Sequence, residues 1–202
     1  MSIVGITGGI ASGKSSVAKL FESLGAFRVD ADQIGHTVLN DSEVISALVN
    51  RWGHAVLDAD KIPDRSKIAK KVFAKSDTGT NDLAFLESIT HPRIGRRIEN
   101  LIQECRNSGK TVILDAALLH EAGWASKCNS VIFVDTTWSV RLARAEQRGW
   151  SEEDLRLREA AQLPIEEKRK RADIVIDNSG TLEDTHAQVR KIWGKITSQP
   201  FP

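Results

Sequence analysis

The sequence predicts an α/β fold in which helices cover both faces of a parallel sheet. Three observations lead to this class: short β-branched segments alternate with amphipathic helices, the first such segment runs into a glycine-rich turn, and acidic residues follow several of the apolar segments. Ligands of open parallel sheets bind at the carboxyl ends of the strands. The residues at those ends are therefore the first candidates for function.

The predicted strands are short apolar runs at residues 2–7, 26–32, 111–119, 130–135 and 172–180. Apolar residues at spacings of three and four predict one helix directly after the glycine-rich turn and three more at residues 139–149, 151–163 and 181–196. Between about 33 and 107 the pattern is almost entirely helical. We therefore expect a separate helical lobe inserted between the second and third strands.

The charge balance and the cysteines exclude several classes of protein. The chain has 202 residues, with 28 lysines and arginines against 27 acidic residues, so no overall field favours nucleic acid or an anionic membrane. Cys105 and Cys128 cannot form a disulfide framework or a CxxC metal site, which fits a reducing compartment. Without a signal-peptide pattern or an apolar run of about 20 residues, we expect a cytoplasmic protein. We also expect a monomer, with an oligomer left open.

The stretch GITGGIASGKSS, residues 5–16, contains a phosphate-binding motif. Gly8, Gly13, Lys14 and Ser15 satisfy GxxxxGK[ST] between a predicted strand and a predicted helix. The glycines allow backbone N–H groups to point at phosphate oxygens, and the helix that starts near Gly13 directs its positive end at them. Lys14 would reach the β- and γ-phosphates of a nucleotide, and the Ser15 hydroxyl would ligate Mg²⁺. The alternative is a glycine-rich turn that binds nothing.

Acidic residues at the ends of predicted strands are candidates for chemistry. Asp30 and Asp32 project to the same side if the second strand continues that far. Two carboxylates that face a phosphate site repel the nucleotide unless a metal ion or an acceptor hydroxyl lies between them. We expect Asp32 to accept the proton of an attacking hydroxyl and Asp30 to make a structural or metal-water contact, the alternative being a cap on the next helix. Asp115 resembles the acid of a Walker B strand, which holds Mg²⁺, and Asp135 is interpreted as structural.

Arginines and one histidine are candidates for contacts to phosphate and substrate. Arg141, Arg144 and Arg148 share a predicted helix face, where they could meet the charge on a transferring phosphoryl group; the alternative is a solvated face. Pro92 is expected to start a helix with His91 at its N-terminal edge. His91 is then either a capping or packed residue or a substrate contact from the helical lobe, and the spacing leaves both open.

The order and spacing of these motifs resemble the dephospho-coenzyme A kinase family over essentially the whole chain. The segments that carry the resemblance are GITGGIASGKSSVAKLFESLGAFRVDADQI, DRSKIAKKVF, THPRI, LDAALLHE, RLARAEQR and AAQLPIEEKRKRADIVIDNSG. The resemblance implies a three-layer P-loop kinase fold with a five-stranded parallel sheet. It implies a nucleotide-binding core at residues 1–32, 108–136 and 172–202, a helical coenzyme A-binding lobe at 33–107 and a helical lid at 137–171.

The resemblance also implies an activity: transfer of the ATP γ-phosphate to the 3′-hydroxyl of the dephospho-coenzyme A ribose, the last step of coenzyme A synthesis, with ATP and Mg²⁺ as cofactors. The implied catalytic residues are Lys14, Asp32 and Arg144, with Arg144 as the lid arginine. The implied substrate contacts are Asp32, Arg65 and His91, and the implied metal ligands are Ser15 and Asp115. The implied ATP contacts are Gly9, Ala11, Ser12, Gly13, Lys14, Ser15, Ser16, Asn178 and Gly180, the last two on the adenine side.

Three positions depart from the family pattern. Ala117 stands where the family usually has proline, and His120 stands where it has an aromatic or aliphatic residue before Glu121. Position 141, often glutamine in relatives, is arginine here, so the resemblance gives Arg141 no role.

Two other functions compete with this one. A shikimate- or nucleotide-type small-molecule kinase would phosphorylate a different alcohol. A nucleotide-binding regulator would bind ATP without transfer, but it has no need for the transfer set of Lys14, Ser15, Asp32 and Arg144.

Overall fold

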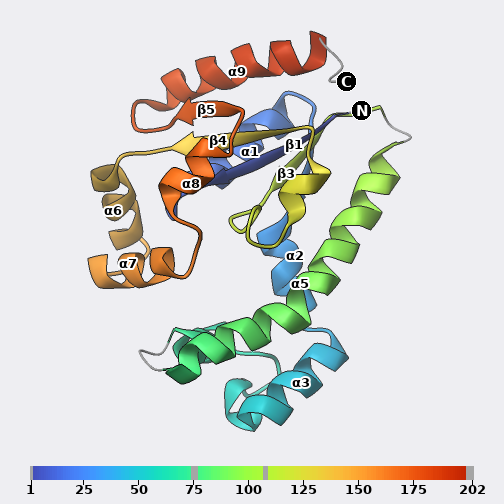
Figure 1. The fold of residues 1–202 in the computed structure, drawn as a ribbon, viewed down its shortest axis with the longest axis vertical. Coiled ribbons are helices and arrows are strands. Elements are labelled where there is room, and N and C mark those ends of the chain that lie inside the picture. Colours follow the sequence, from blue (N-terminus) through green and yellow to red (C-terminus); the bar gives the residue numbers. More distant parts are fainter. Residues whose placement is uncertain (1, 74–76, 107–108, 199–202) are drawn as a thin grey trace. The chain divides into compact units, whose positions relative to one another are not determined.

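The computed structural model describes residues 2–73, 77–106 and 109–198. The chain forms two compact units: unit 1 comprises Met1–Ala31 with Asn100–Pro202, and unit 2 comprises Asp32–Glu99 (Figure 1). Among the described residues, no helix is long and apolar enough to span a membrane.

Unit 1 is built on a five-stranded sheet with the order β2-β3-β1-β4-β5. All the strand pairs are parallel. The strands are β1 (Ile3–Gly8), β2 (Phe27–Asp30), β3 (Val112–Asp115), β4 (Ser130–Asp135) and β5 (Ile174–Asp177). The predicted α/β class with a parallel sheet is therefore confirmed.

Helices of unit 1 cover the sheet. Helices α1 (Lys14–Ser23) and α9 (Leu182–Ser198) pack together on one face, and α8 (Ile165–Lys170) packs on the other, against β1 and β4 (Figure 1). Phe21 of α1 and Val189 of α9 are buried with strand residues such as Ile6 in one apolar cluster. Helices α6 (Trp138–Glu146) and α7 (Glu152–Ala160) pack against each other, and the short helix η2 (Trp124–Lys127) precedes β4.

The strands end on acidic residues that lie side by side. Asp30 of β2 is in register with Asp115 of β3, and Asp135 of β4 is in register with Asp177 of β5. Three strands are shorter than the sequence predicts, among them β5, which spans Ile174–Asp177 and not 172–180. β3 ends at Asp115, although the apolar run continues to Leu119, and β2 ends at Asp30, so the expectation that Asp32 lies on that strand is wrong. The chain enters helix α2 (Ala31–Val38) at once, which puts Asp32 in its first turn.

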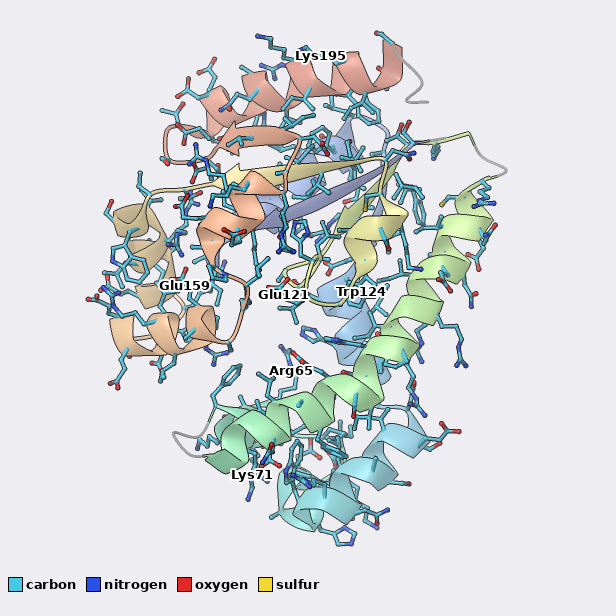
Figure 2. The ribbon with its side chains drawn as sticks, in the orientation of Figure 1. Arg65, Lys71, Glu121, Trp124, Glu159 and Lys195 are labelled. Carbon is cyan, nitrogen blue, oxygen red and sulfur yellow. The ribbon has the colours of Figure 1, made fainter. Side chains whose placement is uncertain are left out.

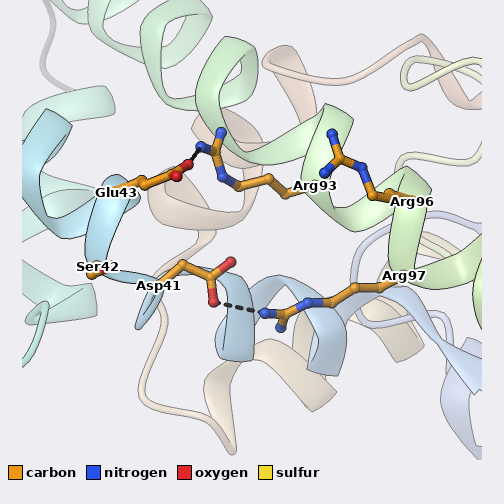
Figure 3. Close-up of a pocket in the computed structure, with 6 residues that line it drawn as sticks. All are labelled: Asp41, Ser42, Glu43, Arg93, Arg96 and Arg97. Carbon is orange, nitrogen blue, oxygen red and sulfur yellow. Dashed lines mark hydrogen bonds and ion pairs between the residues drawn. The ribbon is translucent and has the colours of Figure 1, made fainter.

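Unit 2 is helical, as predicted for this part of the chain. It contains α3 (Ser42–Trp52), η1 (His54–Val56), α4 (Arg65–Val72), and most of α2 and of α5 (Asp77–Arg106). Leu48 and Ile98 are fully buried, and Trp52 packs edge-on against Phe85 with ring centroids 5.5 Å apart. Two ion pairs fasten α5 to the start of α3, Arg93 to Glu43 and Arg97 to Asp41 (Figure 3).

Pro92 does not start a helix but lies inside α5, so the expectation for Pro92 and His91 is wrong. Proline inside a helix costs about 3 kcal/mol because its N–H is missing and its ring meets the preceding turn. Buried Ile94 and Ile98 continue the apolar stripe beyond Pro92, and Arg93 Nη1 donates to the Ile89 carbonyl at 3.0 Å. Packing of this stripe explains why the helix continues.

Candidate active site

The glycine-rich loop between β1 and α1 has a backbone that only certain residues allow. Gly13, the N-cap of α1, has φ of 86°, and an added Cβ would lie 2.2 Å from Asn178 Nδ2. Ala11 also has a positive φ, 60°, which is unfavourable for a residue with a Cβ. Its side chain packs in a small cluster with Ala145 and Leu155. Tertiary packing therefore holds the loop in a conformation that the chain alone disfavours.

The carbonyl of Ser12 is the anchor of this loop. It accepts hydrogen bonds from Thr136 Oγ1 at 2.8 Å, Arg144 Nη1 at 3.0 Å and Asn178 Nδ2 at 2.7 Å. Because the peptide bond is planar and trans, the N–H of Gly13 points away from these donors. Thr185 Oγ1 in turn donates to Asn178 Oδ1 at 2.9 Å, which fixes the amide.

Lys14 does not extend into solvent but pairs with Asp115. The Asp115 carboxylate is fully buried, with Lys14 Nζ on Oδ1 and Arg28 on Oδ2, at 3.1 Å from Nε and 2.6 Å from Nη2. Burial by itself would raise the pKa of Asp115, but Lys14 and Arg28 hold that pKa below its ordinary value. Burial likewise opposes the charge on Arg28, and Asp115 raises the Arg28 pKa nevertheless. Asp115 is therefore an ionised acceptor between two cations.

Arg28 is a site residue that the sequence reasoning missed. It also pairs with Asp30 at the end of the same strand. The alternation of side chains along a strand could have identified it. Residues 28 and 30 of a strand lie on the same face, so a strand that places Asp30 at the site also places Arg28 there.

The three arginines predicted to share a helix face make different contacts, and Arg148 lies beyond α6, which ends at Glu146. Arg144 donates to the Ser12 carbonyl and, at 3.1 Å, to that of Asn178. Burial, with a smaller contribution from nearby Arg148, lowers the pKa of Arg144. Arg148 is exposed, with its guanidinium 6.0 Å from the centroid of the Trp150 ring. Arg141 is buried and bonds to Glu159. Of these three arginines, Arg144 is the one that contacts both the loop and the segment after β5.

Two buried hydroxyls at the loop have no hydrogen-bond partner within the described residues: Thr7 Oγ1 and Ser12 Oγ. Such groups are costly unless a ligand or water satisfies them. The donors around the loop therefore fit a polar, phosphate-bearing ligand.

The family model described as dephospho-CoA kinase matches residues 2–184. The chain belongs to the dephospho-CoA kinase family. A dephospho-CoA kinase of Corynebacterium glutamicum is 39% identical over 199 residues, which cover 97% of this chain and 98% of the relative. A solved dephospho-CoA kinase from Campylobacter jejuni is 28% identical with a TM-score of 0.72, covering 97% of each chain. Shikimate kinase from Acinetobacter baumannii, in complex with shikimate, is 14% identical with a TM-score of 0.53 and covers 100% of this chain and 96% of its own, a likeness of fold alone.

The three residues expected to contact the substrate belong to unit 2. Asp32 is exposed in the first turn of α2, Arg65 is exposed at the start of α4, and His91 is half-buried within α5. Asp64 caps α4, accepting from Ser66 N at 2.9 Å and Lys67 N at 3.1 Å, so the position of Arg65 on that helix is well defined. The structure places these residues in the helical unit and not on the sheet, and their roles stay predictions.

The remaining expected ATP residues are Ser15, Ser16, Gly9 and Gly180. Ser15 and Ser16 are exposed in the first turn of α1. Gly9 leaves little room for a side chain, since a Cβ there would lie 3.0 Å from Ile165 Cδ1 and 3.1 Å from Arg141 Nη1 and would require these side chains to shift slightly. Gly180 follows Asn178 beyond β5, and a Cβ on it would lie 3.2 Å from Asp184 Oδ2.

Two of the positions that depart from the family pattern, Ala117 and His120, lie between β3 and η2. Lys168 of α8, which is 1% exposed, donates to the Ala117 carbonyl and also contacts Glu121. The charged run at residues 166–171 therefore contains a buried lysine. His120 Nε2 is buried without a partner in the described part of the chain, and burial lowers the His120 pKa.

Proposed function

We propose that this protein carries out the reaction of its family with the loop from Gly9 to Ser16, together with Arg144 and Asp32. As a dephospho-CoA kinase family member, the protein is an ATP-dependent kinase. The γ-phosphoryl group leaves the β–γ bridging oxygen of ATP and bonds to the ribose 3′-oxygen of dephospho-CoA. The observation that carries the proposal is the Ser12 carbonyl. Three donors hold it, so the N–H of Gly13 points away from those donors.

On the donor side, Lys14 exchanges partners. Its ammonium group pairs with Asp115 in this structure, and Arg28 stays on the other carboxylate oxygen when Lys14 leaves. Lys14 can therefore move to the β- and γ-phosphates without leaving Asp115 as an uncompensated buried charge. Arg144, whose charge is poorly solvated, then adds positive charge where negative charge builds up during transfer.

On the acceptor side, Asp32 takes the proton of the 3′-hydroxyl or orients that group. Asp32 is an exposed residue in the first turn of α2, so a substrate can reach this position. Arg65 and His91 hold the rest of dephospho-CoA. A guanidinium group suits the phosphates of this substrate because it can donate two parallel hydrogen bonds.

The residues fit Mg²⁺ that is held mainly by the nucleotide. The described residues contain no group of three or more histidines, cysteines or acids that could cage a metal ion. Mg²⁺ in kinases is commonly bound through phosphates and one or two protein oxygens, and it neutralises charge on them. Ser15 would supply one such oxygen, and Asp115 would supply another, directly or through water, on the side that Lys14 vacates when it moves to the phosphates.

The test of Asp32 uses purified protein with ATP, Mg²⁺ and dephospho-CoA. We expect coenzyme A and ADP in equal amounts, and a fall in kcat of about a thousandfold for Asp32→Asn, the range for loss of a positioned base. The Kd for ATP should stay within about twofold, since the donor site is unchanged. Asp60→Asn, an exposed residue of the same unit with the same change of charge, is the control. A kcat of Asp32→Asn equal to that of the control contradicts this role.

The substrate lobe is tested by KM. Arg65→Met should raise the KM for dephospho-CoA by about tenfold and leave the KM for ATP unchanged, while Lys70→Met, exposed on the same helix, should change neither. Phosphorylation of shikimate or a nucleoside monophosphate in place of dephospho-CoA would favour the other small-molecule kinase. ATP binding without transfer to any acceptor would favour a regulator.

We further propose that the kinase works on soluble small molecules as a cytoplasmic monomer. The near-zero net charge supports the absence of a nucleic-acid or membrane partner. The division into core (1–32, 108–136, 172–202), coenzyme A-binding lobe (33–107) and lid (137–171) belongs to the same proposal.

A further inference from the structure

Arg141, to which the family resemblance gives no role, makes contacts that reach from α6 to the phosphate-binding loop. Its residue exposure is 6%, and it donates from Nε to the Thr136 carbonyl at 3.2 Å and from Nη1 to the Ile10 carbonyl at 3.3 Å. The same Nη1 bonds to the carboxylate of Glu159, which lies on α7 (Figure 2). One buried guanidinium group thus joins the loop, the segment after β4 and α7.

We propose that Arg141 and Glu159 form a latch that holds the phosphate-binding loop in the conformation that binds ATP and couples this loop to α7. Arg141 is a positioning residue in this latch, because it acts through the Ile10 carbonyl. The inference rests on the proposed use of the loop for ATP.

Arg141 affects the direction of a peptide group in the loop. The Ile10 carbonyl points at Arg141, so the N–H of Ala11 in the same trans peptide points the other way. The Ser12 carbonyl is fixed in the same manner, which directs the N–H of Gly13. Arg141 and the Ser12 donors therefore orient two N–H groups of the loop, the donors that a phosphate needs.

The loop conformation is strained and needs support from neighbouring side chains. Ala11, directly after Ile10, has a positive φ that an alanine adopts only at a cost. Gly9 lies against Arg141, since a Cβ at position 9 would lie 3.1 Å from Nη1. Without the guanidinium group, the loop loses both the hydrogen bond to Ile10 and the wall beside Gly9, and it can relax away from the strained conformation.

Helix α7 is linked to the loop by two kinds of contact. Leu155 of α7 packs with Ala11 and Ala145, so an apolar contact and the ion pair both tie this helix to the loop. Removing one partner of a buried ion pair leaves the other as an uncompensated charge. Loss of Glu159 should therefore disturb the position of Arg141 and, through it, the loop.

The chain offers a matched control on the same helix. Arg156 and Glu152 form an i,i+4 ion pair with side chains that are 64% and 50% exposed, against 7% and 21% for Arg141 and Glu159. Exposed pairs of this kind contribute little. Glu152→Gln and Glu159→Gln thus make the same chemical change in α7, in an exposed and a mostly buried setting.

The experiment measures the Kd for ATP without acceptor, the KM for both substrates, kcat and the thermal midpoint. Glu159→Gln should raise the Kd and KM for ATP about tenfold and change the KM for dephospho-CoA less than about twofold, within the range for coupled residues. Glu159→Asp, which keeps the charge, should fall between Glu159→Gln and the parent. Glu152→Gln should match the parent protein.

A double-mutant cycle tests whether the two residues act as one unit. Arg141→Gln with Glu159→Gln should raise the Kd for ATP no more than the worse single variant, because each change already breaks the latch. A lower thermal midpoint with an unchanged Kd for ATP in Glu159→Gln would show a purely structural pair and overturn the proposal, as would equal effects of Glu152→Gln. If Arg141→Gln does not fold, the comparison of the three variants at positions 152 and 159 still decides. A parent protein that does not bind ATP contradicts the proposed function instead.

Discussion

The buried carboxylate between Lys14 and Arg28 yields a quantitative prediction for Arg28→Met. Methionine retains the apolar stem and removes two hydrogen bonds to Asp115, at 3.1 and 2.6 Å, from a side chain that is only 12% exposed. Breaking a buried ion pair costs about 3–5 kcal/mol, and Lys14 remains to compensate part of the charge on Asp115. We therefore expect the free energy of unfolding to fall by about 3 kcal/mol at pH 7.

The same variant has a defined pH dependence. In the folded protein the pKa of Asp115 is held below its ordinary value, because Lys14 and Arg28 outweigh the effect of burial. A depressed pKa stabilises the fold above the unfolded-state pKa, and this stabilisation is lost as the pH falls through the folded-state pKa. Arg28→Met moves the folded-state pKa back up. The difference in stability between parent and variant should thus be largest near neutral pH and shrink as the carboxyl is protonated.

The assay is urea unfolding followed by circular dichroism, at pH 7 and in steps down to pH 3. Arg156→Met is the control, since it removes an arginine from an exposed pair worth about 0.3–0.5 kcal/mol. A loss no larger than that of the control at pH 7, or one that is independent of pH, would refute the account of Asp115 as an ionised acceptor between two cations.

Three further outcomes follow from the described contacts. Gly13→Ala should raise the Kd for ATP at least about tenfold and cost about 1–2 kcal/mol of stability, because its φ is 86° and its Cβ would displace Asn178; unchanged ATP titration contradicts this. Lys14→Met should abolish transfer and weaken ATP binding, measured by calorimetry, and normal turnover would disprove a phosphate contact. Burial raises the pKa of Cys128 to about 12, so a thiol reagent at pH 8 should modify this residue only after denaturant is added; rapid labelling of the folded protein argues against it.

Part of the site could be predicted because it is local in the chain. The spacing of Gly8, Gly13, Lys14 and Ser15, together with the strand before and the helix after, specifies a loop at the end of β1. The acids at the strand ends followed from the same reasoning, since parallel strands align their carboxyl ends. Asp30 and Asp115 are indeed neighbours in register.

Other parts of the site could not be predicted because they depend on register and packing. Arg28 contacts Asp115 across 87 residues of sequence, and the Thr136 and Asn178 side chains reach the Ser12 carbonyl across 124 and 166 residues. Helical spacing suggested that Arg141, Arg144 and Arg148 share one task, whereas their burial gives each a different partner. Pro92 was interpreted as a helix start from the local preference of proline for that position. The burial of Ile94 and Ile98, which explains why the helix continues through Pro92, is a property of the folded structure.

The sequence by itself determined the fold class, the position of the phosphate-binding loop and the kind of reaction, because these depend on residue type, periodicity and motif spacing along the chain. Only the tertiary structure decided which groups hold that loop. The Ser12 carbonyl collects its donors from three separate segments, and Asp115 is shared by Lys14 and Arg28. The physical reason is that burial and hydrogen-bond geometry depend on residues that are distant in the sequence and are brought together by folding, so local sequence patterns do not predict them.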